Sequence, residues 1–295
     1  MRFKCRGKKM KDFKSVVFSG GGSRCMWQVG FWQSVSPELK LKPEIVAGVS
    51  AGAAMAGMIM AGTAETGLTL IKEATAANKK NFYISNFLKK EPVFPHYEIY
   101  RNTVLKTMDA GALKRFKKGP EIRVLFANPP AYLGALSGTF VGLMSYVIEK
   151  HTMHPVHPKM ASKLGYKPTV VKLNECSSAE DIADVIMCSS CTPPFLPIMR
   201  YNGKISLDGG IIDNVPVSAI GEDEKKGKML VLMSRIHRAD RIPQTSNRLY
   251  LQPSSTPEIS KWDYTNPAGL QAAYDLGRKD GDNFVKQYRR GDFKK

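Results

Sequence analysis

The 295-residue sequence has little cysteine: five residues, an odd number, spread along the chain. Small secreted folds that depend on disulfides need a denser, paired set, so that class is excluded and reduced thiols in a cytosol-like compartment are expected. Cys188 and Cys191 have the C-x-x-C spacing of redox and zinc sites. No second pair accompanies them and their neighbours are small core-like residues, which predicts structural thiols.

Histidine is scarce as well, with five residues in all. His151, His154 and His157 recur at every third position, a spacing that resembles a set of metal ligands. Pro155 and Pro158 interrupt the local helix, and no acidic ligand stands between the histidines. We therefore expect a polar connecting loop here, and neither a metal nor another cofactor is predicted.

Acidic residues are outnumbered: 26 Asp and Glu accompany 44 Lys and Arg, giving a formal net charge of +18. Such a surface attracts anions, whether nucleic acid, anionic lipid or an acidic substrate. The sequence has neither a recognition helix nor basic motifs interleaved with aromatics, which favours an anionic membrane surface over nucleic acid as the partner. Basic residues cluster in residues 1–14 and 286–295, which we interpret as tails. No pattern indicates an oligomeric state.

A cleavable export signal is not expected either. The apolar run Val16–Phe18 is far too short for the hydrophobic core of a signal peptide, and it ends in glycines. The predicted location is therefore the cytoplasm, with peripheral association to membranes through the basic charge.

Strand-like apolar runs alternate with helix-like patterns along the chain. This alternation is typical of α/β proteins with helices packed on a largely parallel sheet. Strands are expected at 13–19, 45–49, 122–127, 169–173 and 228–233, with a hairpin at 199–207 across Asn202-Gly203. Helices are expected at 26–35, 51–60, 179–187 and 270–288. No repeat or linker divides residues 15–285, which we expect to form one domain between the two tails.

The most specific motif is Gly48-Val49-Ser50-Ala51-Gly52, which joins the strand at 45–49 to the following helix. Gly-x-Ser-x-Gly at a strand-to-helix junction is the pattern of a nucleophile elbow, in which the turn is too tight for side chains on both sides of the serine. Ser50 Oγ then stands at a helix N-terminus, where the dipole favours a developing negative charge.

Two further glycine-rich turns accompany the elbow. Ser19–Arg24 follows the first strand, and its backbone N–H groups suit a phosphate or the oxyanion of an ester carbonyl. It lacks the G-x-G-x-x-G spacing of a dinucleotide site. Asp208-Gly209-Gly210 follows the hairpin and places a carboxylate at a strand end. Taken singly, each of these segments also fits an ordinary tight turn.

Together the three motifs resemble those of the patatin-like phospholipase family. Gly20-Gly21-Gly22-Ser23-Arg24 is similar to the family's oxyanion loop, Gln28-Val29-Gly30 to the helix after it, and Gly48–Ala53 to its nucleophile elbow. Cys25 departs from the pattern, because the family usually has glycine there, and we expect the larger residue to narrow the oxyanion loop.

The resemblance continues toward the end of the chain and covers roughly residues 15–285. Cys191–Pro197 resembles the proline-rich segment that the family places before its second catalytic strand. Asp208-Gly209-Gly210, with Asn214 and Pro216, resembles the Asp motif, and Leu270–Asp282 the terminal helix of bacterial members.

The resemblance implies a three-layer patatin-like fold with a largely parallel central sheet flanked by helices. It implies a lipid acyl hydrolase of phospholipase A or lysophospholipase type, with phospholipid or another acyl lipid as substrate. Ser50 is then the nucleophile and Asp208 the general base of a dyad that forms an acyl-enzyme. The oxyanion hole is expected in Gly20, Gly21, Gly22, Ser23 and Arg24; Gly48 and Gly52 shape the elbow, and Gly209 and Gly210 the Asp motif.

Two other functions stay open on the residues alone. Ser50, Asp208 and His237 occur in the chain order of an α/β-hydrolase triad. Ser50 comes early for that fold, however, and Arg235 and Arg238 beside the histidine indicate a basic surface loop. A non-catalytic protein that binds anionic membranes through its charge is the alternative from another class.

One stretch without charges, Ala131–Ile148, has the length of a short membrane span. Gly134, Gly138 and Gly142 would form a flat stripe on a helix, as in membrane dimers. A buried core helix, a transmembrane helix and a mobile apolar cap beside the Ser50 cleft all fit this pattern. We favour the cap, whose face away from the glycines would shield acyl chains and touch the membrane through Tyr132, Leu136, Phe140 and Leu143.

Overall fold

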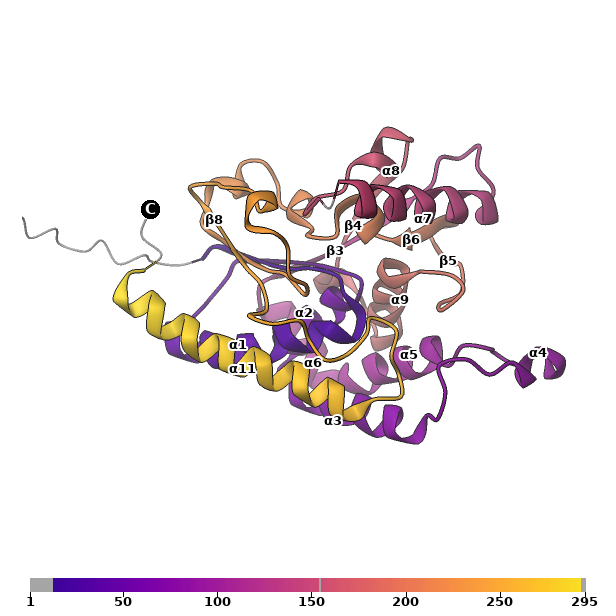
Figure 1. The fold of residues 1–295 in the computed structure, drawn as a ribbon, viewed down its shortest axis with the longest axis horizontal. Coiled ribbons are helices and arrows are strands. Elements are labelled where there is room, and N and C mark those ends of the chain that lie inside the picture. The colour runs from indigo at the N-terminus through magenta and orange to yellow at the C-terminus, as the bar shows by residue number, and fades with distance from the viewer. Residues whose placement is uncertain (1–12, 154, 293–295) are drawn as a thin grey trace, which may run out of the picture.

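The computed structural model describes residues 13–153 and 155–292. A central eight-stranded sheet carries helices on both faces (Figure 1), which confirms the predicted three-layer α/β fold. The strands are β1 (Ser15–Phe18), β2 (Ile45–Val49), β3 (Glu121–Asn128), β4 (Lys167–Lys172), β5 (Met199–Tyr201), β6 (Lys204–Asp208), β7 (Met229–Leu232) and β8 (Arg248–Leu251).

Apart from α4 (Ser85–Lys89), which projects from the body, the described helices cover one or the other face of the sheet. Two short ones and a long one lie on one face: α7 (Ala135–Thr152), α8 (Met160–Lys163) and α10 (Gly210–Asp213). The others are α1 (Met26–Leu39), α2 (Ala51–Ala61), α3 (Ala64–Ala77), α4 (Ser85–Lys89), α5 (His96–Thr107), α6 (Ala110–Lys118), α9 (Ala179–Ser190) and α11 (Pro267–Arg290). A 3₁₀ helix, Gly22–Cys25, leads into α1.

The side chains of each strand point alternately to the two faces of the sheet, and each face carries a hydrophobic core. Val16 and Phe18 point into the larger core beneath α1, α2 and α11, whereas Val17 between them points into the smaller core beneath α7. Successive side chains of a strand face opposite sides of its sheet, so a strand that is buried on both faces is apolar throughout. This is why the strand residues form continuous apolar runs in the sequence.

The central strands β3, β2, β1, β7 and β8 are parallel, so their carboxyl ends share one edge of the sheet. β4 runs antiparallel along residues 123–128 of β3. A strand has only two pairing edges, so the other partners of β3 must share its remaining edge. β2 pairs with residues 121–125 and β6, antiparallel, with Phe126 and Ala127. β6 thereby continues past the end of β2, and its last residue, Asp208, arrives where Ser50 begins.

The predicted elements lie close to their predicted positions, whereas several other elements were not predicted. β2 has the predicted bounds, and α2, α9 and the β5–β6 hairpin differ by a few residues at most. Helices α3 to α6, between residues 64 and 118, and the edge strand β8 were not predicted. α11 continues through Arg290, so residues 286–290 are helical rather than part of a tail. Phe13, assigned to the other tail, is buried against the ring of Tyr288.

Helices α1 and α11 pack almost backbone to backbone. A Cβ added at Gly30 would lie 2.0 Å from the carbonyl oxygen of Tyr274, and one at Gly277 would lie 2.1 Å from that of Trp27. Any side chain at either position would force the helices apart. α11 therefore fixes α1, the helix that emerges from the glycine-rich loop.

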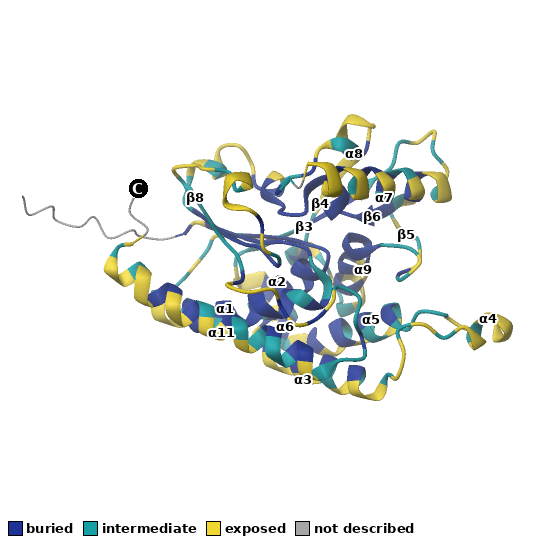
Figure 2. Cartoon of the chain, viewed as in Figure 1, coloured by how far each residue is buried: buried dark blue, intermediate teal, exposed yellow. Residues whose placement is uncertain are grey.

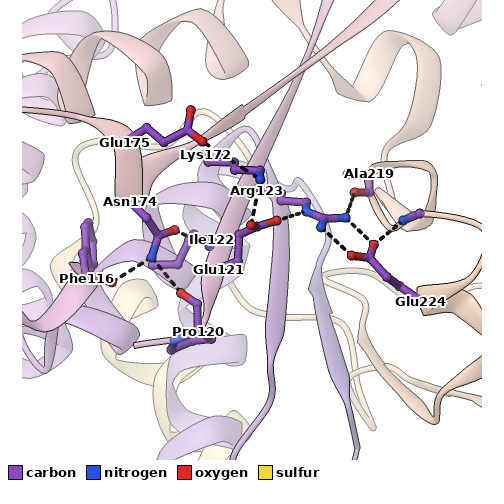
Figure 3. Close-up of polar contacts among 11 residues, drawn as sticks. Phe116, Pro120, Glu121, Ile122, Arg123, Lys172, Asn174, Glu175, Ala219 and Glu224 are labelled. Carbon is purple, nitrogen blue, oxygen red and sulfur yellow. Dashed lines mark hydrogen bonds and ion pairs between the residues drawn. The ribbon is translucent and has the colours of Figure 1, made fainter. Parts of the chain in front are cut away.

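A polar cluster holds the amino-terminal end of β3, away from the elbow (Figure 3). Arg123 donates to both carboxylate oxygens of Glu224, at 2.6 and 2.7 Å, and to Glu121 at 2.5 Å. The hydrogen bonds from Arg123 lower the pKa of Glu224 to about 2. Asn174 accepts from the backbone N–H of Ile122 and donates to the carbonyls of Phe116 and Pro120. This network fixes the amino-terminal end of β3, the strand with which both β2 and β6 pair.

The stretch 131–148 forms most of α7. Its glycine stripe faces the protein: a Cβ at Gly138 would lie 2.8 Å from Pro129, and one at Gly142 3.0 Å from the ring of Tyr166. The opposite face is apolar and exposed, with Tyr132, Leu136 and Phe140 between 66 and 82% exposed. A buried core helix is therefore wrong. Leu143, predicted on the outer face, is half-buried against the smaller core. Among the described helices, α7 included, none has the length and hydropathy that a membrane span requires.

Candidate functional site

Ser50 occupies a strained turn between β2 and α2. Its backbone has φ 53° and ψ −136°, a conformation that residues with a Cβ adopt only under constraint, and its side chain is 4% exposed. The glycines on either side allow the close approach. A Cβ at Gly48 would lie 2.6 Å from Ala53 Cα, and one at Gly52 would lie 2.3 Å from the Ser19 carbonyl oxygen. This is the tight, strained strand-to-helix turn that the predicted nucleophile elbow requires, although Ser50 itself is buried here.

A second serine, Ser189 at the end of α9, supports this turn. Its hydroxyl accepts from the Ser50 N–H at 2.7 Å and donates to the Leu125 carbonyl of β3 at 2.6 Å. Its own carbonyl accepts from the Gly209 N–H at 3.2 Å. One residue thus ties together β2, β3 and the turn after β6. Sequence reasoning missed it, because a serine in a helix carries no local signal of this role.

Asp208 ends β6 and is 5% exposed. Its Oδ1 accepts from the Gly210 N–H at 2.7 Å, and its Oδ2 accepts from the Thr192 hydroxyl at 3.1 Å. Lys261 Nζ lies 3.9 Å from the same Oδ2. These partners stabilise a carboxylate in a buried place. Within the described residues no hydrogen bond joins Asp208 to Ser50 directly, although the sheet brings them to one end.

The glycine loop lies beside the elbow. A Cβ at Gly20 would be 3.3 Å from Ser50 Cβ and 2.8 Å from the side-chain oxygen of Asn214. The N–H of Gly20 is already engaged, donating to the Asn214 carbonyl at 3.0 Å. In the described part of the chain, the N–H groups of Gly21 and Gly22 have no hydrogen-bond acceptor. These two groups are therefore the donors that the loop offers to a ligand.

The remaining residues of the loop hold it in place or pack beneath it. The Ser23 N–H donates to the Lys261 carbonyl at 3.2 Å, and its hydroxyl donates to the Asp263 carbonyl at 3.2 Å. Arg24 Nε is buried without a partner among the described residues. Cys25 lies beneath the loop, where its thiol donates to the Ser19 carbonyl at 3.4 Å. Its side chain is fully buried, which raises the pKa of the thiol to about 12 and makes it an inert packing group.

The histidines lie elsewhere. His237 is 8% exposed rather than on an open loop; its Nε2 accepts from Arg235 Nε at 3.1 Å. Burial and the charge of Arg235 lower its pKa to about 4. No hydrogen bond in the described part of the chain links His237 to Asp208. His157 instead contacts Asp213 at 2.8 Å and the Tyr250 hydroxyl at 3.1 Å.

No metal site emerges from the residues that the structure describes, since no group of three or more His, Cys, Asp or Glu gathers there. His154, in the predicted polar loop, and Cys5 lie outside those residues. Cys188 and Cys191 are buried free thiols, and burial raises the pKa of each.

A narrow apolar cavity of about 30 Å³ opens beside the loop and the elbow. Gly22, Ser23 and Ala51 line the end near Ser50, and the wall is formed by side chains of α1, α2, α3, α5 and α11 together with Tyr264. The wall residues are mainly apolar: Met26, Met55, Met58, Ile71, Thr75, Tyr100, Thr103, Val104, Tyr264 and Leu270. Flexible methionines in the wall can move to enlarge such a cavity.

A sheet whose parallel strands end at a serine elbow, with a buried carboxylate and a glycine loop beside it, defines an α/β protein with a hydrolase-like site. The model of the patatin-like phospholipase family matches residues 16–220. The chain therefore belongs to the patatin-like phospholipase family, and this membership indicates a lipid acyl hydrolase.

Two solved structures are similar to this chain at low identity. VipD from Legionella pneumophila is 13% identical with a TM-score of 0.46, and the type III effector protein ExoU is 15% identical with a TM-score of 0.37. Each is matched over 94% of this chain, which spans 67% of the VipD chain and 53% of the ExoU chain. No curated protein matched the sequence significantly. The family assignment rests on the family match, which covers the glycine loop, the elbow and the Asp motif.

Proposed function

We propose that this protein is a phospholipase A or lysophospholipase that cleaves fatty-acyl esters through a Ser50–Asp208 dyad. The observation that carries the proposal is the shared edge of β3. β2 and β6 meet there end to end, so the strained serine and the buried carboxylate come from adjacent strand ends. The glycine loop after β1 also lies beside Ser50.

The proposed reaction proceeds in two halves. Asp208 takes the proton of the Ser50 hydroxyl while Oγ attacks the ester carbonyl carbon, giving a tetrahedral oxyanion. The carbon–oxygen bond to the leaving alcohol then breaks, and that alcohol leaves with the proton from Asp208. In the second half Asp208 deprotonates a water molecule, whose oxygen attacks the acyl carbon. The bond from that carbon to Ser50 Oγ then breaks, Asp208 returns the proton to Oγ, and the fatty acid leaves.

The oxyanion in this proposal is held by the N–H groups of Gly21 and Gly22. They have no acceptor in the described structure, whereas the Gly20 N–H already donates to Asn214. Donors that are fixed before the reaction stabilise a developing charge without reorganisation. Gly20 then provides close approach to Ser50, and Ser23 fixes the loop through Lys261 and Asp263.

The apolar cavity beside Ser50 is the proposed site for the acyl chain. Its present volume is too small for a whole fatty-acyl tail, so entry requires Met55 and Met58 to move. Methionine side chains are unbranched and adapt at low cost. We also propose that Leu136 and Phe140 on the exposed face of α7, with Tyr132 in the turn before it, form the lipid-facing cap. The basic surface would hold the enzyme peripherally on anionic membranes.

Fatty-acid release from phosphatidylcholine vesicles that contain phosphatidylglycerol tests the proposal. Wild type should release fatty acid, and Ser50→Ala and Asp208→Asn should not. A fluorophosphonate probe should label wild type at Ser50 and leave Ser50→Ala unlabelled. Full activity of Ser50→Ala contradicts any mechanism based on this nucleophile, and absence of hydrolysis in wild type favours the non-catalytic membrane-binding alternative.

Salt dependence tests the membrane part separately. Attraction between surface charges fades over a Debye length of about 8 Å at physiological ionic strength. Activity on anionic vesicles should fall as salt rises, whereas hydrolysis of a soluble short-chain ester should change little. An equal response with both substrates contradicts charge-driven membrane association.

A further inference from the structure

Residues 79–94, here called the finger, project from the body at the end of the molecule opposite the carboxyl end of α11 (Figure 1). The finger contains the one-turn helix α4, and large apolar side chains occupy its tip. Ile84 is 74% exposed, Phe87 78% and Leu88 88%. Figure 2 shows α4 as exposed on a thin connection to α5. Exposed apolar side chains that cluster, unlike those scattered singly over a surface, are typical of interaction sites.

The finger is held in shape by hydrogen bonds along its length. The Tyr83 N–H donates to the Val93 carbonyl at 2.9 Å, and Asn86 Nδ2 donates to the Pro92 carbonyl at 2.9 Å. At the base, the Tyr83 hydroxyl donates to Asn78 Oδ1 at 2.9 Å and accepts from the N–H groups of Lys79 and Lys80. With these hydrogen bonds formed within the finger, its apolar tip stays exposed to solvent.

The charge of the finger points to an anionic surface. Lys79 and Lys80 precede the tip, Lys89 and Lys90 follow it, and all four are exposed. Glu91 is the one acidic residue in residues 79–94. Apolar anchors bordered by lysines are typical of segments that lie in the membrane interface, where the lysines reach the phosphates. A tip of three side chains is too small for a stable protein interface, which buries about 1,200 Å² or more.

Contacts connect the finger directly to the candidate site. Asn81 Oδ1 accepts from the Tyr264 N–H at 2.7 Å, and Asn81 Nδ2 donates to Asp263 at 3.3 Å. These residues follow Lys261, whose amine lies 3.9 Å from the Asp208 carboxylate and whose carbonyl accepts from the glycine loop.

A series of aromatic contacts follows the same path. The ring of Phe82 lies 5.3 Å from that of Phe94, and Phe94 lies 5.0 Å from Phe195. Phe195 stacks on Trp262 at 4.5 Å, and Lys261 Nζ lies 4.5 Å from the centroid of the Trp262 ring. None of these four rings is fully buried. An apolar path therefore runs from the base of the finger to the mouth of the site.

We propose that the finger is a membrane anchor: Ile84, Phe87 and Leu88 insert into an anionic bilayer, and the four lysines contact its phosphates. Insertion places the aromatic path, and with it Ser50 and Asp208, next to the bilayer surface. The inference rests on the proposed function for its purpose, since an enzyme for membrane lipid must hold its site at the membrane. It goes beyond that function because it names a surface outside both the site and α7.

The experiment measures binding in the Ser50→Ala background, so that vesicles are not consumed. Sedimentation with vesicles of phosphatidylcholine and phosphatidylglycerol at 3:1 compares the background protein with a variant carrying Ile84→Ser, Phe87→Ser and Leu88→Ser. We expect about tenfold weaker partition for this variant. Val170→Ser with Ile236→Ser, at exposed apolar positions elsewhere, is the matched control and should bind within twofold of the background. Equal binding of all three proteins overturns the proposal.

A second variant keeps the test valid if the triple substitution disturbs folding. Phe87→Trp preserves an aromatic side chain at the tip, and the added fluorescence, relative to the background protein, should shift to the blue and be quenched by acyl-brominated lipid. An added emission that vesicles leave unchanged contradicts insertion. Lys89→Gln with Lys90→Gln should weaken binding to anionic vesicles about tenfold and leave binding to pure phosphatidylcholine unchanged. A loss of self-association in the triple variant, with normal vesicle binding, identifies a second copy as the occupant and overturns the membrane anchor.

Activity separates the anchor from the proposed function. In the Ser50-containing protein, the triple variant should lower the ratio of the vesicle rate to the short-chain ester rate about tenfold. If wild type hydrolyses no ester, the proposed function fails while the sedimentation and fluorescence results still decide whether the finger inserts.

Discussion

The Ser189 hydroxyl accepts a 2.7 Å hydrogen bond from the backbone N–H of Ser50. Ser189 lies 139 residues later in the chain, and it also donates to the Leu125 carbonyl. A strained turn persists only where its surroundings fix it. The relationship therefore makes α9 part of the machinery that holds the proposed nucleophile, although no atom of α9 needs to touch substrate.

Ser189→Ala should weaken both the fold and the reaction. It leaves the buried N–H of Ser50 and the carbonyl of Leu125 without this partner, which costs about 1–3 kcal/mol. Urea unfolding should show that loss, and kcat for ester hydrolysis should fall about tenfold because the elbow is less well fixed. Ser190→Ala, which removes a hydroxyl that contacts Tyr100 instead, is the control and should leave kcat nearly unchanged. Equal effects of the two substitutions on kcat contradict a role specific to Ser189.

The Ser50–Asp208 dyad predicts non-additive kinetics. Ser50→Ala and Asp208→Asn should each remove nearly all hydrolysis, and the double variant should be little worse than either, because residues that act as one unit are not additive. Circular dichroism should show that all three variants keep the fold. If Asp208→Asn retains substantial activity, Asp208 is not the general base.

His237 should affect acid stability and not catalysis. Its pKa is about 4 in the fold, because it is buried, against about 6.5 in the unfolded chain. The unfolded state therefore binds a proton first as pH falls from 6.5 toward 4, and the folded state loses stability across that window. His237→Gln should lose less stability between pH 7 and pH 4.5 than wild type in urea unfolding.

At pH 7 the same variant should keep kcat/KM within about tenfold of wild type, equivalent to about 1.4 kcal/mol of barrier. Complete loss of activity in His237→Gln, with Asp208→Asn still active, indicates the triad. His96, whose pKa is also lowered by burial, contributes to acid sensitivity in both proteins and so cancels in the comparison.

The exposed face of α7 gives a prediction that tests whether this helix contacts lipid. Leu136 and Phe140 are 80% and 66% exposed, so Leu136→Asp with Phe140→Asp should leave thermal unfolding within about 1 kcal/mol of wild type. Activity on vesicles should fall far more than activity on a soluble ester. An equal loss on both substrates means that α7 does not face lipid.

Asn174 should prove necessary for stability at the far end of β3. Its side-chain amide forms hydrogen bonds with three backbone groups, at distances of 2.7 to 2.9 Å. Asn174→Ala should lower the free energy of unfolding by about 1–3 kcal/mol in urea. Asn283→Ala, on the exposed side of α11, is the control and should change it by less than about 0.5 kcal/mol. Matching losses in the two variants would mean that the Asn174 network adds nothing.

The parts of the fold that the sequence predicted are those with local signals. β2 and α2 meet at a motif whose glycines are required by contacts within a few residues, so the motif alone identifies the turn. The hairpin before Asp208 has an Asn-Gly turn, and Asn202 adopts the left-handed conformation that this turn needs. α4 has only five residues and β8 only four, so neither stands out against its neighbours. α6 has an apolar face, with Ala112 and Phe116 buried, but its nine residues carry only that short pattern among lysines and arginine.

The supporting residues of the site could not be predicted, because their roles depend on distant segments. Ser189, Thr192 and Lys261 reach Ser50 and Asp208 only after the sheet has brought β2, β3 and β6 together. The glycine stripe of α7 was visible in the sequence, but its partners Pro129 and Tyr166 were not. A stripe of small residues indicates close packing and says nothing of what packs against it.

The close packing of α1 on α11, at Gly30 and Gly277, has a consequence for the order of events during protein synthesis. When residue 220 has been synthesised, the chain already contains Ser50 and Asp208, the two proposed reactive residues. It still lacks β7, which pairs with β1, and α11, which fixes α1. The glycine loop connects β1 to α1, so we expect its geometry to be fixed only after β7 and α11 have been synthesised. A nascent chain that lacks α11 thus carries the proposed nucleophile without a finished oxyanion site, and we expect competence for hydrolysis only after α11 has been synthesised.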